Sequence, residues 1–143
     1  MKRHSSVFGA IALFLLGLCP VFAHAGCTAS TITGTYGFSE EGYGIETGKP
    51  NPKFLPIALV GTFTFNADGT VNRALTISGA GGPASGADSG TYTVNADCSG
   101  TALFPNSPIG VEPFNLTIVG GGNAIHFINM VTGVVLAGRM ERQ

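Results

Sequence analysis

Charged side chains are scarce in this 143-residue chain: only 10% of its residues are Asp, Glu, Lys or Arg. Beyond residue 25, five basic residues stand against eight acidic ones, a formal charge of 5 − 8 = −3. A chain with so few cations lacks the basic surface that binds nucleic acid. We therefore expect no nucleic-acid partner.

Metal-binding side chains are also few. Beyond residue 25 the chain holds two cysteines, Cys27 and Cys98, and one histidine, His126, which is too few soft ligands for a zinc site. We expect neither a metal nor a cofactor. Two cysteines in an oxidising compartment are expected to pair, so the sequence predicts a disulfide between Cys27 and Cys98. Two free or metal-binding thiols are the alternative.

Long apolar runs are absent except at the start of the chain. Residues 7–18 carry no charge, follow Lys2 and Arg3, and precede Pro20 and the small residues at positions 23 and 25. This pattern is typical of a signal peptide over residues 1–25, cleaved after Ala25. We therefore expect a secreted or periplasmic protein.

The mature chain has 143 − 25 = 118 residues, enough for a single domain over residues 26–143. No run in it approaches the ~20 apolar residues that span a bilayer, so we expect no membrane span. A lipoprotein modified at Cys27 is an alternative, although His24 stands where a lipobox usually has Leu.

What is abundant is the residue set of β-strands: Gly, Thr, Val, Ile and Phe. Apolar and polar residues alternate with period two, and turn residues separate the alternating segments. The pattern predicts strands over residues 31–39, 55–66, 70–78, 90–95, 100–104, 113–119, 124–129 and 133–140. Eight sequential strands predict an all-β fold, an antiparallel up-and-down barrel. A two-sheet β-sandwich is the alternative.

The connections between these strands are of two kinds. Those at 66–69, 95–99 and 120–123 are tight, whereas 40–54, 79–89 and 105–112 are expected to be long loops. Alternate connections of a meander fall at opposite ends, so all the long loops share one end, where binding is expected. Cys27 and Cys98 both fall at the tight-turn end, which is consistent with their pairing.

Several residues are candidates for a ligand site. Alternation turns Arg73 inward, where a guanidinium needs a partner; it would anchor an anionic ligand group, or an internal ion pair or a bulge accounts for it. Tyr36 is the other polar candidate of the interior, and Phe63 and Leu116 would belong to its apolar wall. Tyr43 and Ile45 lie in the longest expected loop and would form a lid, or simply pack on the rim.

No catalytic constellation stands out. His126 alternates with apolar neighbours and should face outward, and no nucleophile is paired with it. Glu40 and Glu112 both fall near the long-loop end, but the sequence does not fix their separation. Glu40, Glu41 and Glu46 would either bind a cation or form a solvated loop face.

Gly34-Thr35-Tyr36 on the first strand and Arg139 on the last resemble the calycin arrangement of lipocalins and avidins. In those families a Gly-x-Trp motif of the first strand packs near the closed end of the barrel, and in lipocalins an Arg of the last strand lies over the Trp ring. The resemblance implies the same places for Tyr36 and Arg139. Tyr36 stands in place of Trp, and the size is nearer to avidin or to allene-oxide-cyclase-like barrels. The resemblance implies a barrel that binds a ligand.

Three functions follow as hypotheses. The first is a non-enzymatic extracytoplasmic protein that binds a small, largely apolar molecule at the long-loop end. The second is a protein-interaction or surface structural module, expected if side chains fill the barrel. The third is an enzyme of the cyclase or isomerase kind acting on a lipid-like substrate, with Arg73 and Tyr36 inside the cavity. The sequence does not determine the oligomeric state.

Overall fold

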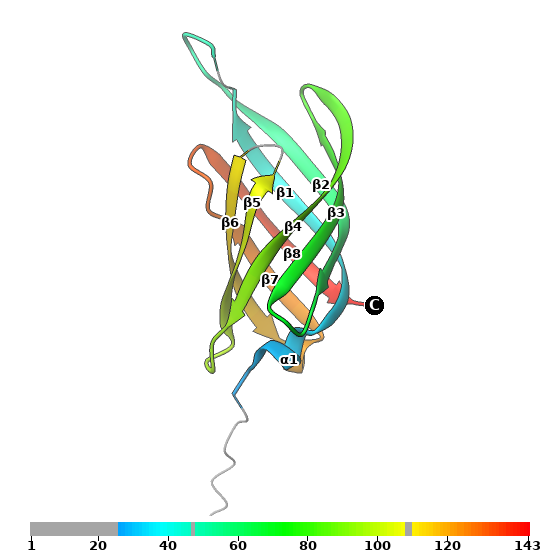
Figure 1. Ribbon diagram of the computed structural model, residues 1–143. Helices are drawn as coiled ribbons and strands as arrows, with labels where there is room; N and C mark the ends of the chain where they lie inside the picture. The colour runs from blue at the N-terminus through cyan, green and yellow to red at the C-terminus, as the bar shows by residue number, and fades with distance from the viewer. Residues whose placement is uncertain (1–25, 47, 108–109) are drawn as a thin grey trace, which may run out of the picture.

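The chain forms a closed barrel of eight antiparallel strands in sequence order (Figure 1). The computed structural model describes residues 26–46, 48–107 and 110–143, so the predicted signal peptide lies outside the described residues. The strands are β1 (Gly34–Ile45), β2 (Phe54–Phe65), β3 (Thr70–Gly79), β4 (Gly82–Val94), β5 (Ser99–Ser107), β6 (Gly110–Val119), β7 (Ala124–Asn129) and β8 (Val134–Arg142). Pairing of β1 with β8 closes the sheet. The predicted up-and-down barrel is confirmed.

Several strand boundaries differ from the prediction. The expected long loop at 79–89 is instead a hairpin, because β3 and β4 stay paired from Thr70↔Thr91 to Gly79↔Gly82. The expected loop at 40–54 is shorter, because β1 continues to Ile45. The expected start of the first strand is a short helix, α1 (Ala29–Ile32). The end with long connections is therefore built mostly from extended hairpins.

The strands are staggered round the barrel. From Glu40, the cross-strand pairs through β2 and β3 lead to Ala84 of β4, whereas the pairs through β8, β7, β6 and β5 lead to Val94. The stagger is thus 94 − 84 = 10 residues. An eight-stranded barrel has an interior about wide enough for side chains to fill.

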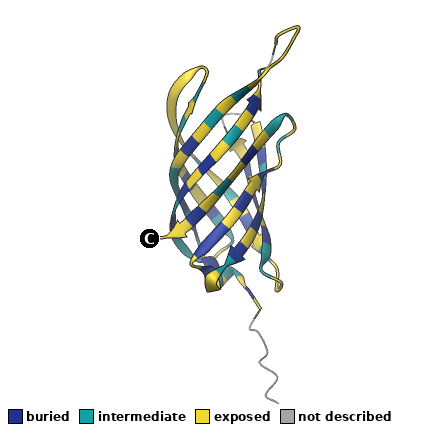
Figure 2. Cartoon of the chain, turned by 180° about the vertical axis from the view of Figure 1, so that it is seen from behind, coloured by how far each residue is buried: buried dark blue, intermediate teal, exposed yellow. Residues whose placement is uncertain are grey.

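Aromatic side chains fill the lower interior. Inward and outward residues alternate along most of each strand, which gives the banded burial pattern of Figure 2; residues 82–87 of β4 are all exposed. Phe63 stands at the centre: its ring lies 4.9 Å from that of Phe38 and 5.6 Å from that of Phe104, and edge-to-face contacts dominate the cluster. Such contacts stabilise by about 1 kcal/mol each beyond their apolar burial. The other buried rings are Tyr36, Phe65, Tyr92, Phe114 and Phe127.

Helix α1 covers the closed end, where the chain enters the barrel and the tight turns lie (Figure 1). The Tyr36 hydroxyl donates to the carbonyl oxygen of Gly122 at 2.6 Å. The guanidinium of Arg142 lies 4.9 Å above the Tyr36 ring and donates to the carbonyl oxygens of Thr31 and Thr33. A Cβ on Gly122 would run into the Thr31 carbonyl, so only glycine permits this approach.

The cation over the Tyr36 ring is therefore not the one expected. Arg139 was expected there, but it faces outward and pairs with Glu141 on the surface. Residues of one strand face alternate sides of the sheet, so Arg142 shares the inward face with Met140 whereas Arg139 does not. The expectation for Arg139 was wrong.

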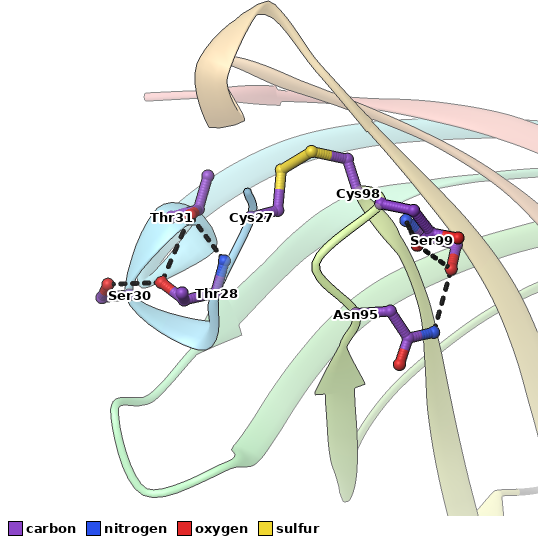
Figure 3. The surroundings of a disulfide bond; sticks show 8 residues. Cys27, Thr28, Ser30, Thr31, Asn95, Cys98 and Ser99 are labelled. Atoms are coloured by element: carbon purple, nitrogen blue, oxygen red, sulfur yellow. Dashed lines mark hydrogen bonds between the residues drawn. A yellow bond between two sulfur atoms is a disulfide. The ribbon is translucent and has the colours of Figure 1, made fainter. Parts of the chain in front are cut away.

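The predicted disulfide between Cys27 and Cys98 is present, with 4.9 Å between the two Cα atoms (Figure 3). It joins the segment before α1 to the turn between β4 and β5, and the Cys27 amide also donates to the Ala96 carbonyl. On the chain-entropy model a bond that closes a loop of 71 residues stabilises the fold by about 4 kcal/mol. Among the described residues, no helix has the length and apolar character to cross a bilayer.

Cys98 has a left-handed backbone conformation, which favours glycine. Residues 61–70 and 90–99 share six of ten residues, and both contain a turn that begins Asn-Ala-Asp. In each turn the Asp accepts hydrogen bonds from the residue two positions on, Thr70 or Ser99. Gly69 has φ +85° in the first turn, and Cys98 has φ +67° in the second. The disulfide thus requires a cysteine side chain at position 98, where the positive φ favours glycine.

We predict that the backbone strain at Cys98 can be separated from the bond it makes. The variants C27S/C98S and C27S/C98G both lack the disulfide, but only the second relieves the left-handed backbone. C27S/C98G should be more stable by about 1 kcal/mol, measured by urea unfolding. Equal stability of the two variants would show that position 98 carries no strain.

Candidate functional site: a buried polar layer

Six polar side chains form a layer across the barrel above the aromatic core. They come from six different strands, and we call them the polar floor: Glu40, Arg73, Asp88, Ser107, Glu112 and Asn129. A stagger of ten residues over eight strands is about one and a quarter residues per strand. Three steps separate β1 from β4, so the stagger between them is about four residues. The residue of β4 at the same height along the barrel axis as Glu40 is therefore Asp88, four residues beyond Ala84.

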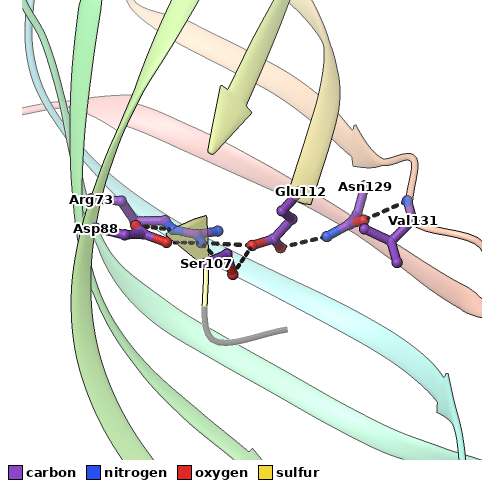
Figure 4. A network of polar contacts seen from close by, with 6 residues as sticks. All are labelled: Arg73, Asp88, Ser107, Glu112, Asn129 and Val131. Carbon is purple, nitrogen blue, oxygen red and sulfur yellow. Dashed lines mark hydrogen bonds and ion pairs between the residues drawn. The ribbon is translucent and has the colours of Figure 1, made fainter. Parts of the chain in front are cut away.

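Arg73 lies at one end of a row of polar contacts that runs through Glu112 to Asn129 (Figure 4). Its Nε donates to Asp88 Oδ1 at 2.9 Å and its Nη2 to Asp88 Oδ2 at 2.6 Å, a two-pronged ion pair between neighbouring strands. Nη2 also donates to Glu112 Oε2 at 2.6 Å, across the part of the barrel where β4 and β5 are no longer paired. One guanidinium is thus held by two carboxylates.

Ser107 and Asn129 continue the network. The Ser107 hydroxyl donates to Glu112 Oε2 at 2.8 Å, and Asn129 Nδ2 donates to Glu112 Oε1 at 2.6 Å. The Asn129 side-chain oxygen accepts from the Val131 amide (Figure 4). Both oxygens of Glu112 are therefore satisfied, as a buried carboxylate requires.

Aromatic rings form the underside of the floor. The guanidinium carbon of Arg73 lies 4.3 Å from the centre of the Phe104 ring and 5.6 Å from that of Phe114. Burial acts to lower the pKa of Arg73, but its hydrogen bonds and ion pairs with Asp88 and Glu112 outweigh burial and raise the pKa above the ordinary value. Arg73 stays charged, and cation–π contact adds to its stabilisation.

Glu40 is the exception in this layer. It is 1% exposed, yet neither of its carboxylate oxygens has a hydrogen-bond partner among the described residues. Burial, with a smaller contribution from the charge of Glu112, raises the pKa of Glu40 to about 7, although Arg73 acts in the opposite direction. Nη1 of Arg73 also lacks a partner in the described part of the chain. Among the described residues, the floor therefore has an acceptor and a donor that remain unsatisfied.

Half-buried aliphatic side chains stand above the floor, on the inner faces of the extended hairpins. We call them the aliphatic collar: Ile57, Leu75, Ile77 and Val134. They pack against the core but remain partly exposed, unlike Leu59 and Leu136, which are buried. The barrel interior thus has two parts: a closed aromatic part below the polar floor and an aliphatic part above it that reaches solvent.

The candidate residues from the sequence fall in three places. Arg73 lies in the polar floor, 5.9 Å from the ring centre of Phe63, and Leu116 is packed in the same core. Tyr36 lies at the closed end. The internal ion pair that was one alternative for Arg73 is confirmed. Tyr43 and Ile45 lie in β1, on its outer face, so the expectation that they belong to a loop is wrong.

Exposed apolar residues gather on the outer wall near the open end. Tyr43 is 53% exposed, Phe54 57% and Val135 60%, and these three surround a hollow of about 310 Å³. On the other side of Tyr43 lies a hollow of about 730 Å³ between β1, β2 and the tip of β3, lined in part by Pro56 and Ala58. Of the four collar residues, Ile57 lines the larger hollow, whereas Leu75, Ile77 and Val134 line neither.

The other candidates lie apart from the floor. His126 faces outward, as predicted, on the outer face of β7. Glu41 and Glu46 lie away from Glu40: Glu41 faces outward on β1, and Glu46 follows the strand. No cluster of three or more His, Cys, Asp or Glu side chains within the described part of the chain is arranged to hold a metal ion.

Three of the six residues of the polar floor, Asp88, Ser107 and Asn129, were not among the candidates from the sequence. Asp88 fell in an expected loop and Ser107 in another, because the segments around them lack apolar alternation. Asn129 was placed correctly on a strand, and its alternation with Phe127 and Ile125 gave an inward signal. Ser107 faces inward only because a bulge after Phe104 shifts the register, which no local pattern reveals.

Comparison of the chain with protein-family models, with curated proteins and with solved structures finds no match. The resemblance to calycins therefore stays a prediction. Function has to be argued from the chemistry of the barrel itself.

The buried state of Glu40 predicts how stability depends on pH. Its pKa of about 7 lies above the value of 4.5 for an unperturbed glutamate, so the folded protein loses stability as pH rises from about 4.5 to 7. Glu40→Gln removes this penalty. The variant should be more stable than the wild type by about 3 kcal/mol at pH 8, and the difference should vanish below about pH 4. Urea unfolding at several pH values measures it.

The neighbouring substitution Glu41→Gln serves as the control, because Glu41 is exposed on the outer face of the same strand. It should leave the pH dependence unchanged. A Glu40→Gln variant that is destabilised at pH 8 would contradict the assignment of Glu40 as an unpartnered buried acid.

Proposed function

We propose that this protein is a non-enzymatic, extracytoplasmic binding protein that takes a small, largely apolar molecule into its open end. The molecule would lie against the aliphatic collar and end at the polar floor. Ligand sites are typically apolar walls with a few polar groups that fix orientation. The collar and the floor together have that composition, and the disulfide is compatible with an oxidising compartment.

The observation that carries the proposal is the unpartnered carboxylate of Glu40 beneath half-buried aliphatic side chains. Buried polar groups in native proteins are nearly always hydrogen-bonded, and an exception calls for an explanation. An unsatisfied charged group costs more than the roughly 1–3 kcal/mol of a neutral one. A bound molecule that reaches Glu40 would supply the missing partner.

The filled aromatic core decides where such a molecule would lie. Phe63 and Leu116 are 1% and 3% exposed and packed among other side chains, so they support the floor from below rather than touching a ligand. Arg73 is neutralised by Asp88 and Glu112, which argues against its expected role as an anchor for an anionic group.

The enzyme hypothesis receives less support. It relied on Tyr36 and Arg73 converging on a substrate. The Tyr36 hydroxyl instead donates to Gly122 at the closed end, and Arg73 is bound by two carboxylates.

Self-association is the second candidate function, and the exposed apolar residues of the outer wall favour it. The occupant we propose there is a second copy of this chain. In the patch, the exposed rings of Tyr43 and Phe54 line a shallow hollow together with Val135. A two-fold contact needs such a self-complementary surface. Exposed apolar patches commonly mark interaction sites.

A neutral apolar dye, N-phenyl-1-naphthylamine, tests the binding proposal. We expect saturable, 1:1 binding to the mature, disulfide-bonded protein. Ile77→Asn in the collar should weaken binding about fivefold, because it removes part of the apolar contact. Ile128→Asn, on the outer face of β7, should leave binding unchanged. Dye fluorescence measures both affinities, and native mass spectrometry of the same samples reports self-association.

Absence of saturable binding would contradict the binding proposal, as would equal effects of the two substitutions. A dimer that persists in native spectra and is lost in Tyr43→Ser would favour self-association instead.

A further inference from the structure

We propose that the open end selects an amphiphile with a primary ammonium head, which Glu40 binds as the partner it lacks. This inference rests on the proposed function and adds the chemical class of the ligand. Three observations carry it: the charges of the floor, the unpartnered atoms of Glu40, and the position of Glu40 below the collar.

The charges of the floor favour a cation. Arg73 faces Asp88 and Glu112, so this trio carries one net negative charge, and an ionised Glu40 makes the floor more negative by another unit. Within the described interior at this level, β2, β5, β7 and β8 contribute no charged side chain; Ser107 and Asn129 are polar but neutral. A carboxylate or phosphate head would meet two unneutralised negative charges, whereas a cation would neutralise one of them.

The hydrogen-bonding capacity of Glu40 favours a donor. Both of its oxygens are buried, and both lack a partner among the described residues. An ionised carboxylate only accepts hydrogen bonds, so the head that satisfies it must donate. A primary ammonium supplies three donors together with a positive charge, and a hydrogen bond between charged groups is about twice as strong as one between neutral groups.

The arrangement also fixes which part of the molecule goes where. The collar residues Ile57, Ile77 and Val134 are only partly buried, so an alkyl chain would complete their burial. The head would then reach the floor at the end of the chain. The strands leave no second unpartnered carboxylate in the described interior, since Glu112 and Asp88 are both hydrogen-bonded.

Binding of such a head should release protons at acidic pH. With its pKa raised to about 7 by burial and by Glu112, Glu40 is mostly protonated at pH 6 in the free protein. An ammonium head requires the ionised form, so binding at pH 6 should expel up to about one proton, and binding at pH 8 should expel almost none. A neutral or anionic head has no such requirement.

The test compares eight-carbon probes that differ only in the head: octylammonium, octan-1-ol, octanoate and octyltrimethylammonium. Calorimetric titration of the mature, disulfide-bonded protein at pH 8 should show octylammonium binding at least about tenfold more tightly than octan-1-ol or octanoate. Octyltrimethylammonium, a cation without a donor, should fall between octylammonium and octanoate. At pH 6, titrations in two buffers of different ionisation enthalpy should show proton release for the two cations, octylammonium and octyltrimethylammonium, and none for octan-1-ol or octanoate.

Two variants assign the effect to Glu40. Glu40→Gln should bring octylammonium and octan-1-ol within about threefold of each other and abolish the proton release. Glu41→Gln, on the outer face one residue away, should change neither. Glu40→Gln is expected to fold, because it removes a buried charge.

The outcomes separate this inference from the proposed function. Octanoate binding as tightly as octylammonium, or an ammonium preference that survives in Glu40→Gln, overturns the head-group assignment and leaves apolar binding standing. Absence of binding by all four probes, together with absence of binding by the neutral dye, overturns both.

Discussion

A single buried guanidinium organises the interior of this barrel. Arg73 points inward from β3, where a charge is costly unless it is paired and hydrogen-bonded. Its partners, Asp88 and Glu112, come from β4 and β6, and Ser107 and Asn129 complete the hydrogen bonds of Glu112. Satisfying one cation thus brings together five strands. The resulting layer separates an aromatic core that is closed to solvent from an aliphatic collar that is open to it.

The same network bridges the place where the sheet is weakest. β4 pairs with β5 over only four residue pairs, from Thr91↔Leu103 to Val94↔Gly100, whereas β3 and β4 are paired over ten. Above Gly90 the two strands separate, and the ion pair from Arg73 to Glu112 spans the opening, where backbone hydrogen bonds between β4 and β5 are absent among the described residues. Glu40, on the other side of the barrel, shares the layer but not the network. Within residues 26–46, 48–107 and 110–143, its carboxylate is the one carboxylate of the floor with no partner on either oxygen.

The fold was largely predictable from the sequence. Alternation along residues 55–66 and 113–119 and the Asn-Ala-Asp turns are strong local signals of the strand order. The count of two cysteines predicted the disulfide, and alternation from Val71 to Ile77 predicted the inward position of Arg73. The extent of the strands was not predictable, because residues 82–90 are rich in Gly, Ala and Ser and carry no apolar alternation. They form a strand because β3 supplies their hydrogen-bond partners. The position of Arg142 was predictable in principle, since it shares the inward face with Met140. The resemblance to calycins instead predicted Arg139 over the Tyr36 ring.

The polar floor was harder to predict because it is a property of the closed barrel. Glu40 belongs to it only through a stagger of ten residues accumulated over eight strands, and Ser107 only through a bulge. The sequence predicted that Glu40 and Glu112 lie near the same end of the barrel. It did not reveal that Glu112 has hydrogen-bond partners and that Glu40 has none among the described residues. Because of that difference, the carboxylate that is free to accept a hydrogen bond from a ligand is Glu40.

The protonation of Glu40 tests this account most directly. Carbon-detected NMR of the side-chain carboxyl groups follows each glutamate of the ligand-free protein through pH, and Glu40→Gln assigns the signal. The account predicts that Glu40 titrates with a midpoint near pH 7, because it is buried without a partner. A midpoint near the ordinary value of 4.5 would contradict it, since it would show that Glu40 is solvated or already paired in the free protein.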